Sequence, residues 1–307
     1  MVPPDARPAP RPLLVLAAVL AAFATAILLS GPLHGVLASL FPAIPFAKVF
    51  RYLLLALLLG VLVVAAAPWR DFDKRTLYGL RGPRSRPRLL FVGFAVAVAL
   101  LAAIAGLDAL LGHLRFDEAQ GWKKFRARLP AVVGGAVVLG LTEEVFFRGW
   151  LFERVRSRWS TVATALLLAL IFGSLHAFRA SDAPRDLVAG PAAAVSTMGA
   201  WARNLVDVTD FGPSFLALVL LSLVLTAAYL RFATLWFGVG FHGGASMFMN
   251  LNSALTDRDV ERNWLGSKWL YDGVVGWVLL AALLALLWPR RTRNAASRPP
   301  PPPESAA

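Results

Sequence analysis

Two adjacent carboxylates, Glu143 and Glu144, lie in a segment that is otherwise almost entirely apolar from residue 131 to residue 147. A carboxylate in the hydrocarbon of a bilayer costs about 2.5 kcal/mol or more, so acids in such segments are usually retained for function. Two imidazoles, His176 and His242, lie in two further apolar segments. One acid and two histidines from three membrane helices form a candidate active site, in which the acid serves as general base toward water.

The first of these segments contains a second charged pair. Glu144 and Arg148 are four residues apart, a spacing that places them on one helical face where they can pair. Pairing lowers the cost of burying either charge. Glu143 is turned by about 100° from its neighbour around the helix. We therefore expect Glu143 to point elsewhere and to be the unpaired acid, while a purely structural ion pair between helices is the alternative for Glu144 and Arg148.

Both the residue type of His176 and its spacing from neighbouring residues favour a position in the candidate active site. Phe172 precedes it by one helical turn and can pack on the imidazole to fix its angle. Glu143 lies 13 residues before Arg156, and His176 lies 17 residues after Trp159, on either side of one short turn. At 1.5 Å per residue these distances are about 20 and 25 Å, so both side chains reach a similar depth. The alternative is a histidine bonded only to a carbonyl of a neighbouring helix.

His242 belongs to a glycine-rich segment. If the turn before this segment lies at the same end, His242 enters the same layer, because 11 residues of helix span about 16 Å. Ser246 and Asn250 follow at intervals of one turn and add polar groups to its stripe. Gly240 and Gly244 have the small-residue spacing that lets helices approach closely. The glycines also match a dinucleotide-binding pattern by letter, but no strand precedes them.

Apolar spans must position these residues. The chain has 307 residues, is 58% hydrophobic and has a mean hydropathy of +0.63, values typical of a polytopic membrane protein. We predict an all-α transmembrane bundle of about eight spans. They cover residues 13–31, 46–68, 89–112, 131–152, 161–178, 212–231, 235–255 and 269–288. Residues 186–206 are expected to form an interfacial or re-entrant helix, and there is no internal repeat.

The charge of the chain indicates its orientation. A net charge of +13 favours nucleic-acid binding in a soluble protein. Here the basic residues lie between spans, so we predict no nucleic-acid partner. With the N-terminus inside, the inside loops carry 17 Lys and Arg residues and the outside loops carry 11. This predicts a multi-pass protein of the cell membrane with both termini cytoplasmic, although the basic loop at 115–128 keeps an inverted topology open. The absence of cysteine excludes disulfides and thiolate nucleophiles.

Three motifs occur together in the second half of the chain. They are Glu-Glu-x-x-x-Arg (Glu143, Glu144, Arg148), Phe-x-x-x-His (Phe172, His176) and His-x-x-x-polar (His242, Ser246). In combination they resemble the CPBP (Abi) intramembrane proteases, which include type II CAAX prenyl endopeptidases, bacteriocin-processing proteins and lysostaphin-resistance-protein-A-like proteins. The resemblance covers roughly residues 130–255. It implies an intramembrane endopeptidase that acts on membrane-embedded or lipid-modified peptides.

The resemblance also implies roles for individual residues. Glu143 activates water, His176 helps to orient it, and His242 with its partner stabilises the oxyanion. Where the family pattern has asparagine, this chain has the shorter Ser246, and Asn250 is a supporting candidate only if the helix unwinds or kinks. We expect no cofactor. The alternative is zinc, held by Glu143, His176 and His242.

The predicted organisation has five parts. Residues 1–12 form an N-terminal cytoplasmic segment, 13–129 the first helices and basic loops, 130–255 the CPBP-like core, 256–288 the last loop and span, and 289–307 a disordered basic, proline-rich tail. The apolar run from residue 13 is longer than the core of a cleavable signal peptide, so we predict an uncleaved anchor.

Two other function classes fit parts of the sequence. A non-catalytic membrane scaffold or bacteriocin-immunity-type protein is favoured by Ser246 in place of asparagine. A transporter could use Glu143 and the histidines as a proton relay, but the chain lacks repeats and paired broken helices. As a protease, the protein has two expected partners, a peptide or membrane-protein substrate and the lipid bilayer.

Overall fold

A computed structural model describes residues 12–41, 44, 46–66, 80, 85–177, 191–259 and 262–289 of the chain. Several predictions fall outside these residues. They concern residues 1–11, which make up nearly all of the N-terminal cytoplasmic segment, the tail from residue 290, most of the basic loop at 67–84, and Arg179 and Arg185.

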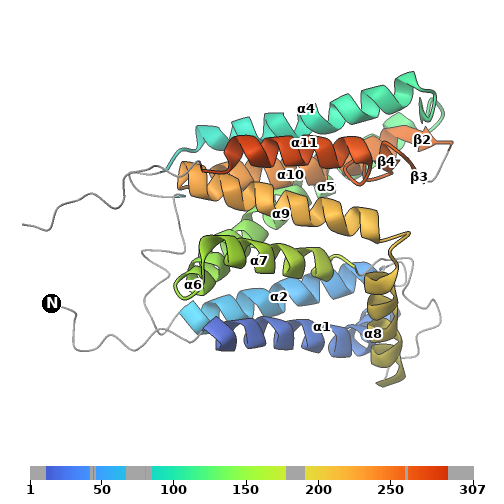
Figure 1. Cartoon of the computed structure of the whole chain (residues 1–307). Helices are drawn as coiled ribbons and strands as arrows, with labels where there is room; N and C mark the ends of the chain where they lie inside the picture. Colours follow the sequence, from blue (N-terminus) through green and yellow to red (C-terminus); the bar gives the residue numbers. More distant parts are fainter. Residues whose placement is uncertain are drawn as a thin grey trace, which may run out of the picture.

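Long antiparallel helices lying side by side make up the bundle (Figure 1). Their bounds are α1 (Pro12–Leu40), α2 (Phe46–Ala66), α4 (Arg88–Leu110), α5 (Gly121–Glu144), α7 (Thr161–Leu175), α9 (Gly212–Phe232), α10 (Trp236–Leu255) and α11 (Val274–Leu287). Helix α5 continues through a π-helical segment, η2 (Val145–Leu151), into α6 (Phe152–Arg156). The all-α bundle is confirmed, and each predicted span corresponds to one helix.

Length and apolar composition qualify only some of these helices as membrane spans. Four segments of the described chain are long and apolar enough: Leu16–Leu40, Arg88–Leu110, Gly121–Arg156 and Gly212–Phe232. Three shorter apolar stretches are Tyr52–Val61, which lies within the 21-residue helix α2, and the helices Thr161–Leu175 and Val274–Leu287. Helix α10, which carries His242, is in neither group because glycines and polar residues lower its hydropathy. The predicted number of eight spans therefore stays a prediction.

The start of α5 corrects the predicted loop at 113–130. Residues Leu114–Phe116 form strand β1, which pairs antiparallel with β2 (Thr256–Arg258). The helix begins at Gly121 and runs through Pro130. Asp117 organises this start, because its side chain accepts hydrogen bonds from the backbone N–H of Gln120 at 2.9 Å and from Lys124 at 2.6 Å. The first turns of α5 are rich in Lys and Arg, which favour helix but are not apolar, so a hydropathy pattern does not detect these turns.

Helix α8 (Pro191–Val206) lies across the end of the bundle rather than along it (Figure 1). This arrangement agrees with the interfacial helix predicted for residues 186–206. Trp201 donates its indole N–H to the carbonyl of Ser174 at 3.0 Å, and Asn204 donates to the carbonyl of Ala177 at 2.7 Å. Both acceptors belong to the end of α7, so α8 covers that end.

Helix α9 joins two apolar layers. Its residues Leu218 and Tyr229 pack in a cluster with α1, α2, η2 and α7, while Val224 and Leu225 pack in a second cluster with α4, α10 and α11. Small residues bring α10 close to its neighbours. A Cβ atom at Gly244 would lie 3.1 Å from the carbonyl oxygen of Phe94 in α4, and one at Gly240 would overlap the carbonyl of Leu90, so the close approach predicted from these two glycines is confirmed. On another side of α10, a Cβ atom at Gly243 would lie 3.1 Å from the carbonyl oxygen of Ala136 in α5.

A second polar network closes the bundle end that carries β2; we call it the end network. Its members are Asp108, His113, Ser214, Arg258, Ser267 and Asp272. Asp108 pairs with Arg258 and, at 3.3 Å, with Nδ1 of His113. Asp272 accepts hydrogen bonds from the hydroxyls of Ser267 at 2.7 Å and Ser214 at 2.9 Å, and from the backbone N–H of Ser267 at 2.7 Å. The network ties α4, α9 and the loop before α11 together.

Candidate active site

The second glutamate of the pair is deeply buried and charge-compensated. Glu144 is the last residue of α5, and its Oε1 accepts a hydrogen bond from Nη1 of Arg148 at 2.9 Å. Both side chains are almost fully buried. The guanidinium also lies over the ring of Phe172, 4.9 Å from its centroid, a contact that stabilises a desolvated cation. The pairing predicted from the spacing of Glu144 and Arg148 is confirmed.

A serine of α9 completes the environment of Arg148. Nη2 of Arg148 donates to the hydroxyl of Ser222 at 2.9 Å and approaches the carbonyl oxygen of the same residue at 3.3 Å. Ser222 is buried, and its carbonyl also accepts from the hydroxyl of Thr226 at 2.9 Å. The sequence analysis did not single out Ser222, because it lies 74 residues from Arg148. The only sequence feature that could have indicated Ser222 is that it forms a polar pair with Thr226, one turn later in the same apolar span.

His242 lies between the two adjacent glutamates. Its Nδ1 is 3.2 Å from Oε1 of Glu144, and its Nε2 is 3.7 Å from Oε2 of Glu143. Glu143 takes no part in the hydrogen bond between Glu144 and Arg148, as its rotation around the helix predicts, but α10 packs so closely on α5 that one imidazole ring reaches both glutamates. The carboxylate of Glu144 only accepts hydrogen bonds, so Nδ1 of His242 carries the proton that is shared with it.

Each glutamate keeps one oxygen without a hydrogen-bond donor among the residues that the structure describes. These oxygens are Oε2 of Glu143 and Oε2 of Glu144, and both are buried. A buried acceptor without a donor costs about 1–3 kcal/mol, and more when it is charged. The side chain of Glu143 is 16% exposed, whereas Oε2 of Glu144 faces the backbone of α10, where a Cβ atom at Gly238 would lie only 2.7 Å away. Glu143 is therefore the more accessible acid of the two.

His176 joins the cluster from the end of α7. Its Nδ1 lies 2.8 Å from the carbonyl oxygen of Phe172, and a carbonyl only accepts, so this nitrogen bears the hydrogen. The ring of Phe172 lies 4.6 Å from the ring of His176 and 6.0 Å from that of His242, measured between centroids. The centroids of the two imidazole rings are therefore separated by at most the sum of these two distances. The predicted packing of Phe172 on His176 is confirmed.

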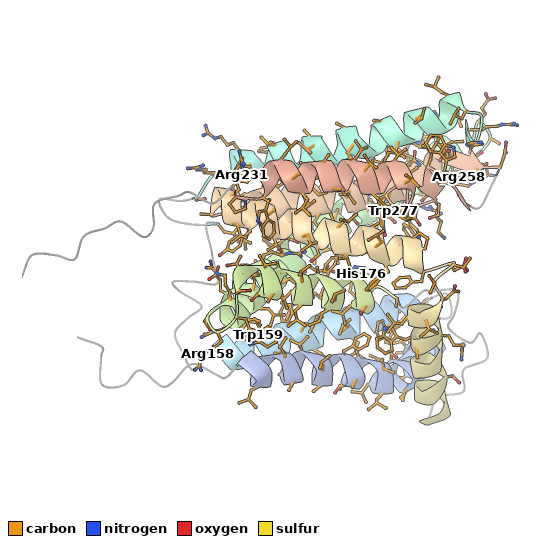
Figure 2. All side chains as sticks on the ribbon, in the orientation of Figure 1. Arg158, Trp159, His176, Arg231, Arg258 and Trp277 are labelled. Carbon is orange, nitrogen blue, oxygen red and sulfur yellow. The ribbon has the colours of Figure 1, made fainter. Side chains whose placement is uncertain are left out.

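The cluster occupies the interior of the bundle. Figure 2 shows His176 between the two ends, with Arg158, Trp159 and Arg231 at one end and Arg258 at the other. Glu144 is 12 residues before Arg156, which at 1.5 Å per residue places it about 18 Å along the helix from that end. A site at this depth can reach a bond within the hydrocarbon layer.

Residues 125–248 match a family model described as type II CAAX prenyl endopeptidase Rce1-like. This match supports the assignment of the chain to the CPBP family. The matched region contains both glutamates, Arg148, His176 and His242 in the arrangement described above. No curated protein and no solved structure gives a significant match. The family is one of proteases, and with its apolar helices this chain is a helical membrane protein.

Ser246 of the third motif and the supporting candidate Asn250 lie apart from the hydrogen bonds of the cluster. Ser246 is partly buried, one turn beyond His242. Asn250 is exposed, and its amide donates to the carbonyl of Ser246 at 2.7 Å. Helix α10 continues unbroken from Trp236 to Leu255. Because the break that would bring Asn250 inward does not occur, this side chain turns back on its own helix.

The zinc alternative of the CPBP resemblance depends on three ligands meeting at one point. Within the described part of the chain, no group of three or more His, Asp or Glu side chains is arranged to hold a metal ion. Phe172 contacts the rings of both His176 and His242, Nδ1 of His176 is held by a backbone carbonyl, and the nitrogens of His242 face the two glutamates. In this arrangement the residues do not fit a three-ligand zinc site.

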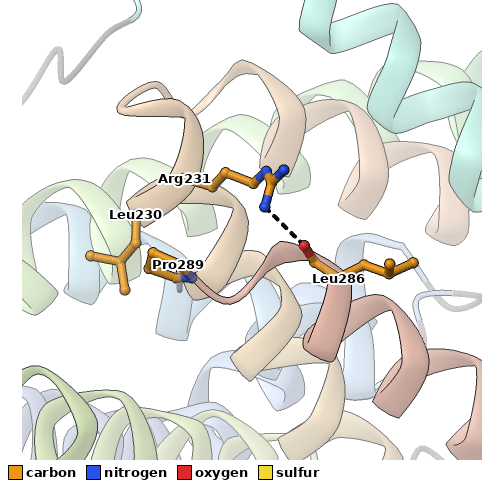
Figure 3. Close-up of a pocket in the computed structure, with 4 residues that line it drawn as sticks. All are labelled: Leu230, Arg231, Leu286 and Pro289. Atoms are coloured by element: carbon orange, nitrogen blue, oxygen red, sulfur yellow. Dashed lines mark hydrogen bonds between the residues drawn. The ribbon is translucent and has the colours of Figure 1, made fainter. Parts of the chain in front are cut away.

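A surface pocket lies elsewhere. It is lined by Leu230, Arg231, Leu286 and Pro289, where α9 and α11 end, and has a volume of about 450 Å³ (Figure 3). Arg231 donates to the carbonyl of Leu286 across it at 2.9 Å. None of its lining residues belongs to the CPBP motifs.

Proposed function

We propose that this protein is an intramembrane endopeptidase that hydrolyses peptide bonds with water activated by Glu143. One observation carries the proposal: the Oε2 atom of Glu143 is buried and has no hydrogen-bond donor among the described residues, yet it lies 3.7 Å from Nε2 of His242. A desolvated carboxylate that is not neutralised by a direct hydrogen bond is suited to accept a proton from water.

The chemistry follows from the positions of the groups. Glu143 takes one proton from water as the water oxygen attacks the carbonyl carbon of the peptide. The resulting C–O bond gives a tetrahedral intermediate with a negatively charged oxygen. Nδ1 of His242 and Nδ1 of His176 already donate to Glu144 and to Phe172, so only Nε2 of each ring is left for this oxyanion, and it stabilises the charge when it carries a proton. Glu143 then returns the proton to the departing amine nitrogen as the C–N bond breaks, and the carboxylate is regenerated.

Glu144 and Arg148 have a different role in this proposal. Glu144 faces Nδ1 of His242, and Arg148 neutralises Glu144. A carboxylate behind an imidazole fixes its tautomer and orientation, as it does in other hydrolases. His242 thereby keeps its Nε2 edge toward Glu143.

The surroundings favour a substrate that is itself in the membrane. The cluster lies at a depth that soluble peptides do not reach, so we propose membrane-embedded or lipid-modified substrates, as the CAAX prenyl endopeptidase description of the family model also favours. The ends labelled by Arg158 and Arg231 lie together (Figure 2). With the excess of basic residues in the loops assigned to that side, we place them at the cytoplasmic face of the cell membrane, together with both termini.

A cleavage assay tests the proposal. Purified full-length protein and its Glu143→Gln variant are each incubated with a membrane proteome in detergent, and new peptide N-termini are identified by mass spectrometry. We expect a set of termini that the wild type creates and the variant does not. Glu153→Gln is the matched control, because Glu153 lies ten residues farther along the same continuous helix. Equal cleavage by Glu143→Gln would reject the role of Glu143.

The same assay addresses the non-catalytic alternative. A scaffold or immunity-type protein creates no new termini, and its phenotype in cells survives Glu143→Gln at normal protein levels. Loss of both the termini and the phenotype in that variant excludes it.

A further inference from the structure

Ser222 connects α9 to the candidate active site although it belongs to none of the three motifs. Its hydroxyl and its carbonyl both face Nη2 of Arg148, at 2.9 and 3.3 Å. Arg148 is 2% exposed, so water does not replace a lost protein partner without rearrangement. Hydrogen bonds to a buried charged group contribute more than neutral ones. Ser222 therefore fixes where the guanidinium lies.

Arg148 in turn fixes Glu144. Its other terminal nitrogen, Nη1, donates to Oε1 of Glu144, while Oε2 of the same carboxylate lies against Gly238. The carboxylate is held on one side by a charge-assisted hydrogen bond and on the other by the backbone of α10. A shift of the guanidinium thus moves the carboxylate.

Glu144 then determines which nitrogen of His242 carries hydrogen. The same Oε1 atom that accepts from Arg148 lies 3.2 Å from Nδ1 of His242. With the hydrogen on Nδ1, the neutral ring presents an unprotonated Nε2 toward Glu143. The partner of one ring nitrogen sets the state of the other.

We propose that Ser222 is a positioning residue, which holds the tautomer and orientation of His242 through Arg148 and Glu144. Four residues from α5, η2, α9 and α10 form this chain of contacts, which begins at Ser222 and ends at His242. The catalytic consequence rests on the proposed function, whereas the tautomer is a property of the folded protein and can be measured without a substrate.

The chain offers a matched control on the same helix. Ser214 is also buried in α9, and its hydroxyl also donates to a charged network, at Asp272. It lies in the end network, away from Arg148. Ser214→Ala therefore removes a buried serine hydroxyl of the same helix without touching the contacts that lead to His242.

Nuclear magnetic resonance of the imidazole nitrogens tests the proposal directly. The chain has four histidines, so ¹⁵N-histidine labelling of the full-length protein in detergent gives few signals, and His242→Gln identifies those of His242. In the wild type we expect a protonated Nδ1 and an unprotonated Nε2. In Ser222→Ala we expect the two shifts to move toward each other as the tautomers mix. Ser214→Ala should leave them unchanged. Unchanged His242 shifts in Ser222→Ala overturn the proposal.

Kinetics provide the second measurement. With a peptide substrate obtained from the proteome assay, Ser222→Ala should lower kcat about tenfold with little change in KM, the pattern of an interaction lost only in the transition state. Ser222→Thr keeps the hydroxyl and should restore kcat. Equal kcat values in wild type and Ser222→Ala overturn the catalytic part. If the wild type cleaves nothing but the shifts of His242 respond as expected, the proposed function fails and the positioning role stands.

Discussion

Two buried charged networks in this protein differ in how their carboxylates are partnered. In the end network, both oxygens of Asp108 face a cationic or imidazole nitrogen, and both oxygens of Asp272 accept hydrogen bonds. In the active-site cluster, one oxygen of each glutamate has no donor within the described residues. A fold that satisfies the carboxylates of one network and leaves those of the other incomplete keeps the incomplete ones at a cost in stability, which is common at functional sites.

This difference separates structural from chemical roles. A fully partnered network holds elements together, and its loss should appear as lost stability. An incompletely partnered acid is available to a substrate or to water, and its loss should appear as lost turnover. The predictions that follow are designed to separate these two readouts.

The largest effect is expected for Glu143→Gln. Removing a general base lowers the rate by about 10²- to 10⁴-fold, so cleavage should become undetectable or nearly so. The melting temperature in detergent should stay the same or rise, because the amide removes a buried charge without breaking a hydrogen bond. A large fall in melting temperature would mean that Glu143 belongs with the structural network instead.

Gly238→Ala should have the next largest effect. The new Cβ atom would lie 2.7 Å from Oε2 of Glu144, closer than van der Waals contact allows, so the carboxylate must move. A displacement of about 1 Å near reacting groups can lower a rate by about 10²-fold. Steady-state kinetics check the prediction. Gly106→Ala is the control, because a Cβ atom there meets nothing within 4 Å.

Arg258→Leu should lower the stability of the protein and leave its turnover unchanged. It leaves the buried Asp108 without its cation, and breaking a buried pair in this way destabilises a protein by about 3–5 kcal/mol. We expect a clear fall in melting temperature but an unchanged kcat per folded molecule. A lower kcat at full folding would show that the two networks are coupled through α9.

A chelator should have the smallest effect. If water is activated by the carboxylate alone, treatment with a zinc chelator followed by its removal should change kcat less than about twofold. Loss of cleavage that added zinc restores would show that the acid serves as a metal ligand, and would replace general-base chemistry with a metal-bound nucleophile.

Local spacing made much of this architecture predictable. Apolar runs located every long helix, and the four-residue spacings predicted the pair of Glu144 with Arg148 and the packing of Phe172 on His176, because these relations depend on one helix alone. The start of α5 at Gly121 was missed because the first turns of this helix are charged, and a hydropathy pattern places the start of the helix after them.

Features that depend on packing between distant segments were not predictable in the same way. The distance between Glu143 and His242 depends on how closely α10 approaches α5. The role of Ser222 depends on the placement of α9 against η2, and a single serine in an apolar span carries no sign of its partner. The catalytic assignments themselves remain predictions until the variants are tested.

The position of His176 has a consequence beyond the interior of the bundle. The carbonyl of Ser174, in the last turn of α7, accepts from Trp201 of α8, and the carbonyl of Ala177, just after His176, accepts from Asn204 of the same helix, which lies crosswise at the end of the bundle. Lifting that helix removes both donors at once and frees the turn on which the imidazole is mounted. If this end of the bundle lies at the membrane boundary, as predicted for residues 186–206, lateral pressure, headgroup composition or a docked protein would act on the candidate active site through α8.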